Sequence, residues 1–251
     1  MIGRLPAPLR TALAMGAIAA DTLWAAPAAM ILGATLGSTH RAVSGVYRDY
    51  ARLMLAVCGA ELRVRGEDRL DPDTRYVFVS NHSSHLDALA ILAALPRHGL
   101  RFVAKKELGR IPLFGTALRT TGNVMVERTD ARRDLATLDA AQRDLLRHIS
   151  VLFFAEGTRS EDGKLHAFKK GAAAFALKAQ LPLVPIGVAG THAILPRGLA
   201  VGAGGPVGVC FGAPIPTDGR GFEERDVLTD ELRASVAREM ARADALRRKK
   251  G

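Results

Sequence analysis

Short apolar runs rich in Val, Ile, Leu and Phe recur along the chain after residue 60, and longer stretches with apolar residues at helical spacing separate them. A short continuous apolar run predicts a buried strand, and apolar residues three to four positions apart predict an amphipathic helix. The predicted strands are 61–65, 76–80, 101–104, 124–126, 151–155, 183–188 and 207–211. The predicted helices are 86–95, a short one ending at 121, 131–149, 170–180 and 223–247.

This alternation of strand and helix is typical of the α/β class, here a single domain with a largely parallel mixed sheet flanked by helices. In strand 61–65, Leu62 and Val64 alternate with charged residues, which predicts a strand at the edge of the sheet. The pattern leaves the order of the other strands open. A length of 251 residues suffices for one core plus an appendage.

The stretch from 11 to 37 is strongly apolar, with ten alanines among its 27 residues and Asp21 as its single charge. It is long enough for a membrane span of about 20 residues and longer than a signal-peptide core of about 7–15. The interior Pro27 and the basic residues on both flanks favour a kinked hairpin or a pair of helices in the membrane interface. A buried alanine-rich helix is the alternative.

Residues 40–58 are predicted to form an amphipathic helix, with apolar residues such as Val43 and Leu53 on one face and basic residues mostly opposite. Such a helix can pack on the domain or lie on lipid, and both alternatives stay open. We therefore divide the chain into a membrane-associated segment of hydrophobic and amphipathic helices, 1–58, and a globular domain, 59–251.

Polar residues gather between strand 76–80 and helix 86–95, in the sequence Asn81-His82-Ser83-Ser84-His85-Leu86-Asp87. At such a turn the side chains project from a rigid scaffold. His82 and Asp87 suit a general base and the carboxylate that orients it. Ser84-x-x-Asp87 also matches a capping box for the helix that follows, and a single His-x4-Asp occurs by chance.

A metal site formed by His82, His85 and Asp87 is a further alternative for this turn. The sequence offers no matching partners elsewhere that would complete the usual set of ligands. We therefore expect neither a metal ion nor another cofactor.

Cationic residues gather near the ends of other predicted strands. Residues 97–133 contain nine Lys and Arg against three Asp and Glu. Lys105 ends one strand, and Arg128 follows another. In open α/β sheets the carboxyl ends of the strands surround the ligand crevice, so both residues are candidates for binding an anion. A solvated basic face is the alternative.

The segment Glu156-Gly157-Thr158-Arg159-Ser160 directly follows the predicted strand 151–155. Gly157 permits a tight turn, Thr158 offers a hydroxyl, and Arg159 offers a planar fork suited to phosphate. The alternative is an ordinary polar turn in which Arg159 pairs with Glu156.

The net charge of +10 and a pI near 10.2 favour an anionic partner, such as nucleic acid, an anionic membrane or a phosphorylated substrate. Aromatic residues make up only 5% of the chain, and it carries no nucleic-acid recognition motif, so we expect no nucleic acid. Cys58 and Cys210 lie in apolar surroundings, which predicts buried thiols in a reducing compartment.

Taken together, four segments resemble the sequence blocks of glycerolipid acyltransferases of the lysophosphatidic acid acyltransferase type, over roughly residues 60–215. They occur in the order of the family, and as a set they are specific. Two departures stand out: Ala155 replaces the usual proline, and Met125 and Glu127 replace the usual Phe and Asp. The blocks are Asn81-His82-x-Ser84-x-x-Asp87, Gly122-Asn123-Val124-Met125-Val126-Glu127-Arg128, Phe154-Ala155-Glu156-Gly157-Thr158-Arg159-Ser160 and Val184-Pro185-Ile186.

The resemblance implies that 59–251 is an acyltransferase domain that makes phosphatidic acid. His82, oriented by Asp87, would take the proton from the free hydroxyl of a lysophospholipid, which then attacks the thioester of acyl-CoA or acyl carrier protein. A backbone N–H near Gly157 would stabilise the oxyanion, and Ser83 and Ser84 would cap the helix rather than act as nucleophiles. The residues implied to hold the acceptor phosphate are Glu156, Gly157, Thr158, Arg159, Arg128 and Lys105.

The same resemblance implies a membrane surface as partner, and with the basic charge it predicts the cytoplasmic face of the inner membrane. Two alternatives stay open: an acyltransferase for another lysolipid, such as lyso-ornithine lipid, or a non-catalytic lipid-binding module at the membrane.

Overall fold

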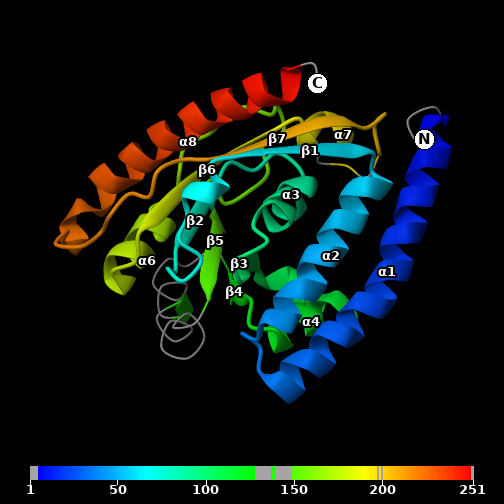
Figure 1. The fold of residues 1–251 in the computed structure, drawn as a ribbon, viewed down its shortest axis with the longest axis horizontal. Coiled ribbons are helices and arrows are strands. Elements are labelled where there is room, and N and C mark those ends of the chain that lie inside the picture. The colour runs from blue at the N-terminus through cyan, green and yellow to red at the C-terminus, as the bar shows by residue number, and fades with distance from the viewer. Residues whose placement is uncertain (1–4, 128–136, 139–148, 197, 199, 250–251) are drawn as a thin grey trace.

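In the computed structural model, residues 5–127, 137–138, 149–196, 198 and 200–249 are described. Within these ranges seven strands form one sheet, in the order β1-β7-β6-β2-β5-β3-β4 (Figure 1). The strands are β1 (Ala60–Arg65), β2 (Val77–Ser80), β3 (Leu100–Lys105), β4 (Val124–Val126), β5 (Ser150–Phe154), β6 (Leu183–Ala189) and β7 (Gly205–Phe211). The α-helices are α1 (Ala7–Leu36), α2 (Arg41–Val57), α3 (Leu86–Ala94), α4 (Phe114–Thr120), α6 (Gly171–Ala179), α7 (Thr191–Ile194) and α8 (Arg225–Arg248).

The sheet is mixed, as expected, and the α/β class is confirmed. Strands β2 to β6 run parallel to one another, β7 is antiparallel to β6, and β1 is parallel to β7. β1 lies at one edge of the sheet, in agreement with its alternating sequence. The carboxyl ends of the five parallel strands therefore meet at one end of the sheet, where ligand sites of this class form.

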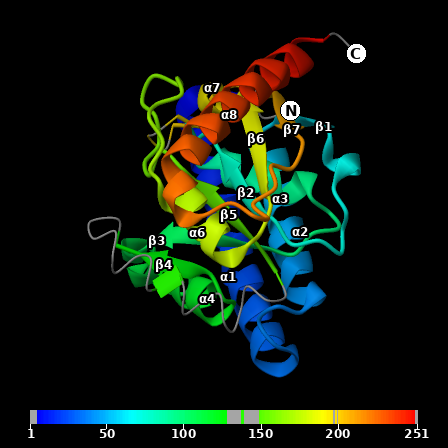
Figure 2. The same cartoon turned by 90° about the vertical axis from the view of Figure 1, so that its left-hand side faces the viewer.

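Alternate side chains of the strands face two separate apolar cores. Phe78 of β2 packs in the core that holds Ile91 of α3. Its neighbours Val77 and Val79 pack in the other core, together with Phe175 of α6. Figures 1 and 2 show the corresponding layers, with α8 covering one face of the sheet and α3, α2 and α1 stacked on the other. Both faces are thus covered, as near-continuous apolar strands require.

α1 differs from its expected form. Neither the kinked hairpin nor the helix pair predicted within 11–37 forms, because α1 runs unbroken through Pro27, and α1 packs against α2. An interior proline removes one backbone hydrogen bond and crowds the preceding turn, which together cost about 3 kcal/mol. Ala25, Ala26 and Ala29 beside it are buried, so packing against the fold opposes a break in the helix.

α2 packs on the domain, which was one of the two alternatives for it. Its Ala51 and Leu55 belong to the same core as Phe78. α1 lies outside α2, and only 17% of its most apolar 18-residue window is buried. Among the described residues α1 is the one helix with the length and composition of a membrane span. The division of the chain at residue 58 stays a prediction.

The predicted helix 131–149 falls largely outside the described residues. Cys58 and Cys210 are buried free thiols, as expected. Burial raises the pKa of both thiols.

Candidate active site

Adjacent parallel strands bring the predicted site residues to one edge of the sheet. The register of β2 and β5 pairs Ser80 with Phe154. His82 lies two residues after Ser80, and Glu156 lies two residues after Phe154. Both residues therefore lie just beyond the carboxyl ends of their strands, side by side. β3 runs parallel beside β5 and ends at Lys105. The common strand direction is what places residues more than 70 positions apart in one site.

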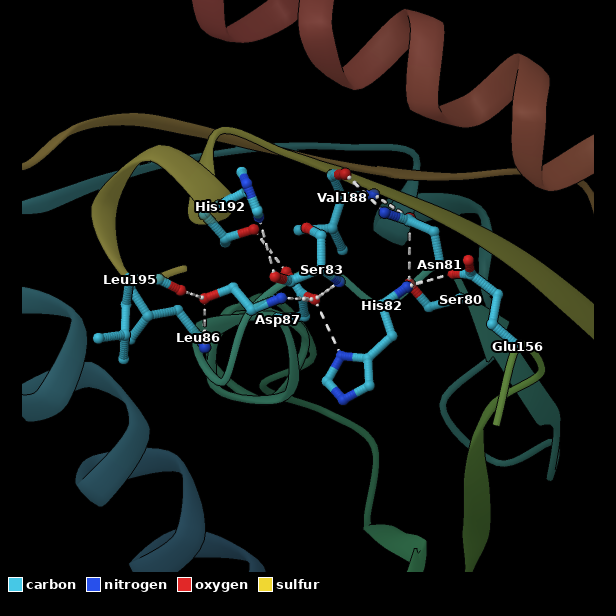
Figure 3. Close-up of polar contacts among 12 residues, drawn as sticks. Ser80, Asn81, His82, Ser83, Leu86, Asp87, Glu156, Val188, His192 and Leu195 are labelled. Atoms are coloured by element: carbon cyan, nitrogen blue, oxygen red, sulfur yellow. Dashed lines mark hydrogen bonds and ion pairs between the residues drawn. The ribbon is translucent and has the colours of Figure 1, made fainter. Parts of the chain in front are cut away.

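His82 and Asp87 form the predicted pair, with His82 Nδ1 3.0 Å from Asp87 Oδ2. The Asp87 side chain is completely buried and that of His82 is 16% exposed. Figure 3 shows the second ring nitrogen, Nε2, directed away from the carboxylate. When Nδ1–H donates to Asp87, Nε2 carries a lone pair and can accept a proton from a substrate.

The Asp87 carboxylate is held by several donors besides His82. Oδ2 accepts the backbone N–H groups of Ser83 at 2.6 Å and Ser84 at 2.8 Å. Oδ1 accepts the hydroxyl of Thr191 at 2.5 Å. These bonds satisfy both oxygens of a completely buried carboxylate and fix its orientation.

One half of the predicted capping box forms at the start of α3, because the Asp87 carboxylate accepts the Ser84 N–H, whereas the N–H of Asp87 donates to the backbone carbonyl of Ser84. The Ser84 Oγ accepts the N–H of Leu86 at 3.0 Å and donates to the carbonyl of Leu195 at 2.6 Å. Because Asp87 also accepts the Ser84 N–H, one carboxylate takes part in both the helix cap and the pair with His82. The two interpretations of this motif are therefore compatible. The Ser84 hydroxyl already donates its proton to a carbonyl.

Neighbouring residues hold the turn and the imidazole in place. The His82 ring stacks on Phe154, with centroids 3.8 Å apart and planes 16° apart. The Asn81 side chain donates to the carbonyl of Val188 at 3.0 Å and accepts its N–H at 2.9 Å. The first contact orients the ring, and the second ties the end of β2 to β6 (Figure 3).

Glu156 connects the loop after β5 to the turn that carries His82. Its Oε1 accepts the N–H of His82 at 2.8 Å, and its Oε2 accepts the N–H of His166 at 2.9 Å. The N–H of Ser160 donates to the carbonyl of His82 at 2.8 Å. The sequence predicts that Glu156 binds the acceptor phosphate, yet both oxygens of this buried carboxylate bind backbone N–H groups. A carboxylate would also repel a phosphate, so this geometry favours a role in holding the loop.

Gly157 has a backbone conformation and a neighbour that exclude a side chain. Its φ is +77°, and a Cβ would lie 2.7 Å from Cε and 3.2 Å from Nζ of Lys169. The ammonium group of Lys169 therefore lies over the loop that is predicted to hold phosphate. The N–H of Gly157 itself donates to the carbonyl of Phe154 at 3.0 Å, so an oxyanion donor near Gly157 stays a prediction for its neighbours.

The predicted cationic residues have different surroundings. Arg159 is half-buried, and its charge acts on His85 in the turn that carries the catalytic pair. Lys105 forms an exposed ion pair with Glu107 at 3.3 Å, a contact that contributes little stability in water. Arg128 lies outside the described residues. Thr158 is exposed at the surface of the loop.

Arg101 does not belong to the solvated basic face that the charge pattern suggests. Its side chain is completely buried and donates to the carbonyl groups of Thr121 at 2.6 Å and Leu100 at 2.8 Å. Burial lowers the pKa of this guanidinium to about 10. Arg101 therefore links the sheet to the segment after α4 and does not contribute to the surface charge.

His85 lies three residues from His82 but has a different protonation behaviour. Desolvation by the surrounding protein and, to a smaller extent, the charge of Arg159 lower the pKa of His85 to about 4, although the residue is partly exposed to solvent. His85 is thus neutral above pH 5. Of the two imidazoles in the turn, the one that contacts Asp87 belongs to His82.

Residues 61–189 match the acyltransferase family, which is half of the chain. The chain belongs to the acyltransferase family. A chloroplastic 1-acyl-sn-glycerol-3-phosphate acyltransferase of Brassica napus is 37% identical over 169 residues, 67% of this chain and 47% of its own length. The corresponding protein of Arabidopsis thaliana is 36% identical over 182 residues, 72% of this chain and 49% of its own length. The chain thus spans about half the length of these curated relatives.

Two further proteins extend the family assignment. A 1-acyl-sn-glycerol-3-phosphate acyltransferase alpha of Ovis aries is 32% identical over 190 residues, 74% of this chain and 66% of its own length. The crystal structure of the 1-acyl-sn-glycerophosphate acyltransferase PlsC of Thermotoga maritima superposes with a TM-score of 0.69 at 25% identity, over 83% of this chain and 81% of that one. The family expected from the four sequence blocks is confirmed.

Within this acyltransferase fold, three residues near the site had no role assigned from the sequence. Phe154 stacks on His82, and the third sequence block contains it, but only as part of the strand before the loop. Thr191 follows β6 after a glycine, and a hydroxyl at the carboxyl end of a parallel strand was the one signal available. Lys169 lies before a predicted helix and carried no signal beyond its charge.

Proposed function

We propose that the chain transfers a fatty acyl group from acyl-CoA or acyl carrier protein to the free hydroxyl of 1-acyl-glycerol-3-phosphate, giving phosphatidic acid. The observation that carries this proposal is the 3.0 Å contact between His82 Nδ1 and the buried Asp87, which leaves Nε2 available as a base. The family and the names of the relatives support the reaction type and the acceptor.

In the proposed reaction, His82 Nε2 accepts the proton of the acceptor hydroxyl while the oxygen attacks the thioester carbonyl. The new ester bond forms, the carbon–sulfur bond breaks, and the leaving thiolate takes the proton from the imidazolium. Asp87 stabilises that imidazolium and keeps the ring in the productive tautomer. Since both substrates bind together, no covalent acyl-enzyme is needed, and their proximity supplies much of the rate.

The acceptor phosphate binds, in this proposal, to the loop after β5. Gly157 allows a close approach of the backbone, Thr158 and Arg159 donate hydrogen bonds, and Lys105 adds positive potential.

Lys169, whose ammonium lies over Gly157, belongs to the same binding group. Arg128 is assigned to the group from the sequence alone, and Glu156 holds the loop from behind.

The α1 helix is proposed to hold the protein at the cytoplasmic face of the inner membrane, where a lysolipid acceptor resides. Its outward face carries large apolar side chains, and positive net charge attracts anionic lipids. Its exposed large apolar residues are Leu9, Leu13, Leu23, Trp24, Ile31 and Leu36.

Mass spectrometry of the products from a panel of lysolipids and both acyl donors tests the proposed reaction. Phosphatidic acid from lysophosphatidic acid, formed with at least one donor, is the expected result. If lyso-ornithine lipid is the one lysolipid that is acylated, the acceptor in the proposed reaction is that lipid and not 1-acyl-glycerol-3-phosphate. Binding of a lysolipid without any acylated product would favour a non-catalytic lipid-binding module. The comparison of acyl-CoA with acyl carrier protein identifies the donor.

A vesicle sedimentation experiment tests the role of α1. The double variant Leu23→Ser, Trp24→Ser removes two side chains that are 68% and 67% exposed, so the fold should persist while binding to anionic vesicles falls. Val227→Ser is the matched control, because Val227 is 64% exposed on α8, across the sheet from α1. Undiminished sedimentation of the double variant would assign membrane binding to another surface.

A further inference from the structure

The two oxygens of the Asp87 carboxylate have unequal support. Oδ2 accepts three N–H groups, from Ser83, Ser84 and His82. Oδ1 accepts the Thr191 hydroxyl at 2.5 Å, its one recorded partner within the described part of the chain. Both side chains are completely buried. The second oxygen of a buried charge thus depends on a single hydroxyl.

The position of Thr191 is itself fixed by the sheet. It is the first residue of α7 and follows Gly190, which has a φ of +99°. A Cβ on Gly190 would lie 2.4 Å from the carbonyl oxygen of Pro206 at the start of β7, so a glycine is required at this turn. The Asn81 side chain binds the backbone of Val188 two residues earlier and keeps the His82 turn in register with this one.

We propose that Thr191 is a positioning residue for the His82–Asp87 pair, and that its hydroxyl holds the Asp87 carboxylate oriented toward His82. The role rests on the proposed function for its effect on acyl transfer, although the effect on the pair itself does not depend on substrate. Thr191 acts through Asp87, and neither the sequence blocks nor the comparisons assign it a role.

Loss of the hydroxyl would leave Oδ1 of a completely buried carboxylate without its donor. The carboxylate then loses the contact that limits its rotation, so fewer molecules hold the imidazole in the productive orientation.

The experiment compares Thr191→Val and Thr191→Ala with Thr191→Ser in the full chain. The two variants without a hydroxyl should lower kcat about tenfold to a hundredfold, with both KM values within about twofold of the original, whereas Thr191→Ser should keep most of the activity. Thr229→Val is the matched control, because Thr229 is also buried and its hydroxyl donates to Arg225 within α8. Circular dichroism and thermal melting identify any variant that does not fold.

A substrate-free measurement separates this inference from the proposed function. The nitrogen shifts of the His82 ring, recorded by NMR at one fixed pH, should show a larger share of the Nε2–H tautomer in Thr191→Ala than in the original chain, because a less firmly oriented carboxylate holds Nδ1–H less well. The other titratable groups around the pair are His85, Glu156, Arg159 and His192, and they stay unchanged in every variant.

Unchanged His82 ring shifts together with unchanged kcat in folded Thr191→Ala would overturn the inference. Changed ring shifts in a chain that acylates no lysolipid would instead overturn the proposed function and leave Thr191 as a positioning residue. Equal losses in Thr191→Ser and Thr191→Val would show that the size of the side chain matters and the hydroxyl does not, which also contradicts the proposal.

Discussion

The two sides of the site are built in different ways. Asp87 is completely buried and receives four hydrogen bonds, and His82 is stacked on Phe154. On the other side, Thr158 and Lys169 are exposed, and the ion pair of Lys105 faces solvent. A proton-transfer pair needs fixed geometry, which buried contacts supply. A loop that admits a charged lipid headgroup must stay accessible, and it relies on charge more than on packing.

This comparison predicts two kinds of defect. Changes to the buried pair should lower kcat and leave the KM values nearly unchanged, because the pair acts on the transferred proton. Changes to the accessible loop should raise the KM of the acceptor and make it more dependent on salt, because the loop contributes binding energy through charge.

The largest effect is expected for His82→Ala, which removes the general base. Such groups contribute about 10²–10⁴-fold to rate, so kcat for phosphatidic acid formation should fall by that factor. Melting temperature and vesicle binding should stay near those of the original chain. His40→Ala is the control, since His40 caps the exposed start of α2, and turnover undiminished in His82→Ala would contradict the base assignment.

Arg159→Ala is expected to raise the acceptor KM about tenfold, since one charge-assisted hydrogen bond to phosphate contributes about 1.5–3 kcal/mol, less where solvent reaches it. The donor KM should change by less than about twofold, because the thioester does not contact this group. Steady-state kinetics with each substrate varied in turn measure both constants. A larger increase in the KM of the donor than in the KM of the acceptor would show that Arg159 binds the acyl donor.

Lys169→Ala should raise the acceptor KM by a smaller factor, about threefold to fivefold, because its ammonium is exposed and screened. Lys170→Ala is a matched control one residue away, and its side chain binds Asp226 at 2.7 Å instead of approaching Gly157. Lys169→Arg should restore most of the affinity. Equal increases of the acceptor KM in Lys169→Ala and Lys170→Ala would show that acceptor binding depends on the net charge of the protein and not on the position of the Lys169 ammonium group.

The smallest effect is expected for His85→Gln. Burial and the charge of Arg159 lower the pKa of His85 to about 4, so this group is already neutral throughout the range in which the enzyme would be assayed. The pH dependence of kcat/KM above pH 5 should therefore be the same in His85→Gln as in the original chain. A change in this pH dependence would show that His85 gains or loses its proton within that range.

Much of the fold was predictable because local patterns and long-range packing agree. The Leu- and Ala-rich stretch after Asp87 forms α3, as its cap and apolar spacing predict. The strands of the parallel sheet carry continuous apolar runs, which signal burial on both faces wherever they occur. α1 was misjudged within 11–37 because Pro27 suggests a break, and the packing of Ala25, Ala26 and Ala29 that opposes it is absent from any local pattern.

In the site, His82, Asp87 and the loop 156–160 were predictable because each follows an apolar strand and carries side chains of recognisable chemistry. The surroundings of Glu156 could not be predicted from the sequence, because an acidic residue in a predicted phosphate-binding loop suggests a contact with the ligand. The structure shows instead that both of its carboxylate oxygens accept backbone N–H groups. The same holds for Arg101, whose charge suggested surface and whose side chain is buried.

The sequence by itself determined the class of fold and the family, and it predicted the contact between His82 and Asp87, because these depend on residue types at short spacing. Only the tertiary structure decided that Thr191 and Phe154 support the pair and that Lys169 reaches Gly157. Those contacts join segments from different strand ends, and the order and direction of the strands, which bring them together, follow from packing of the whole sheet.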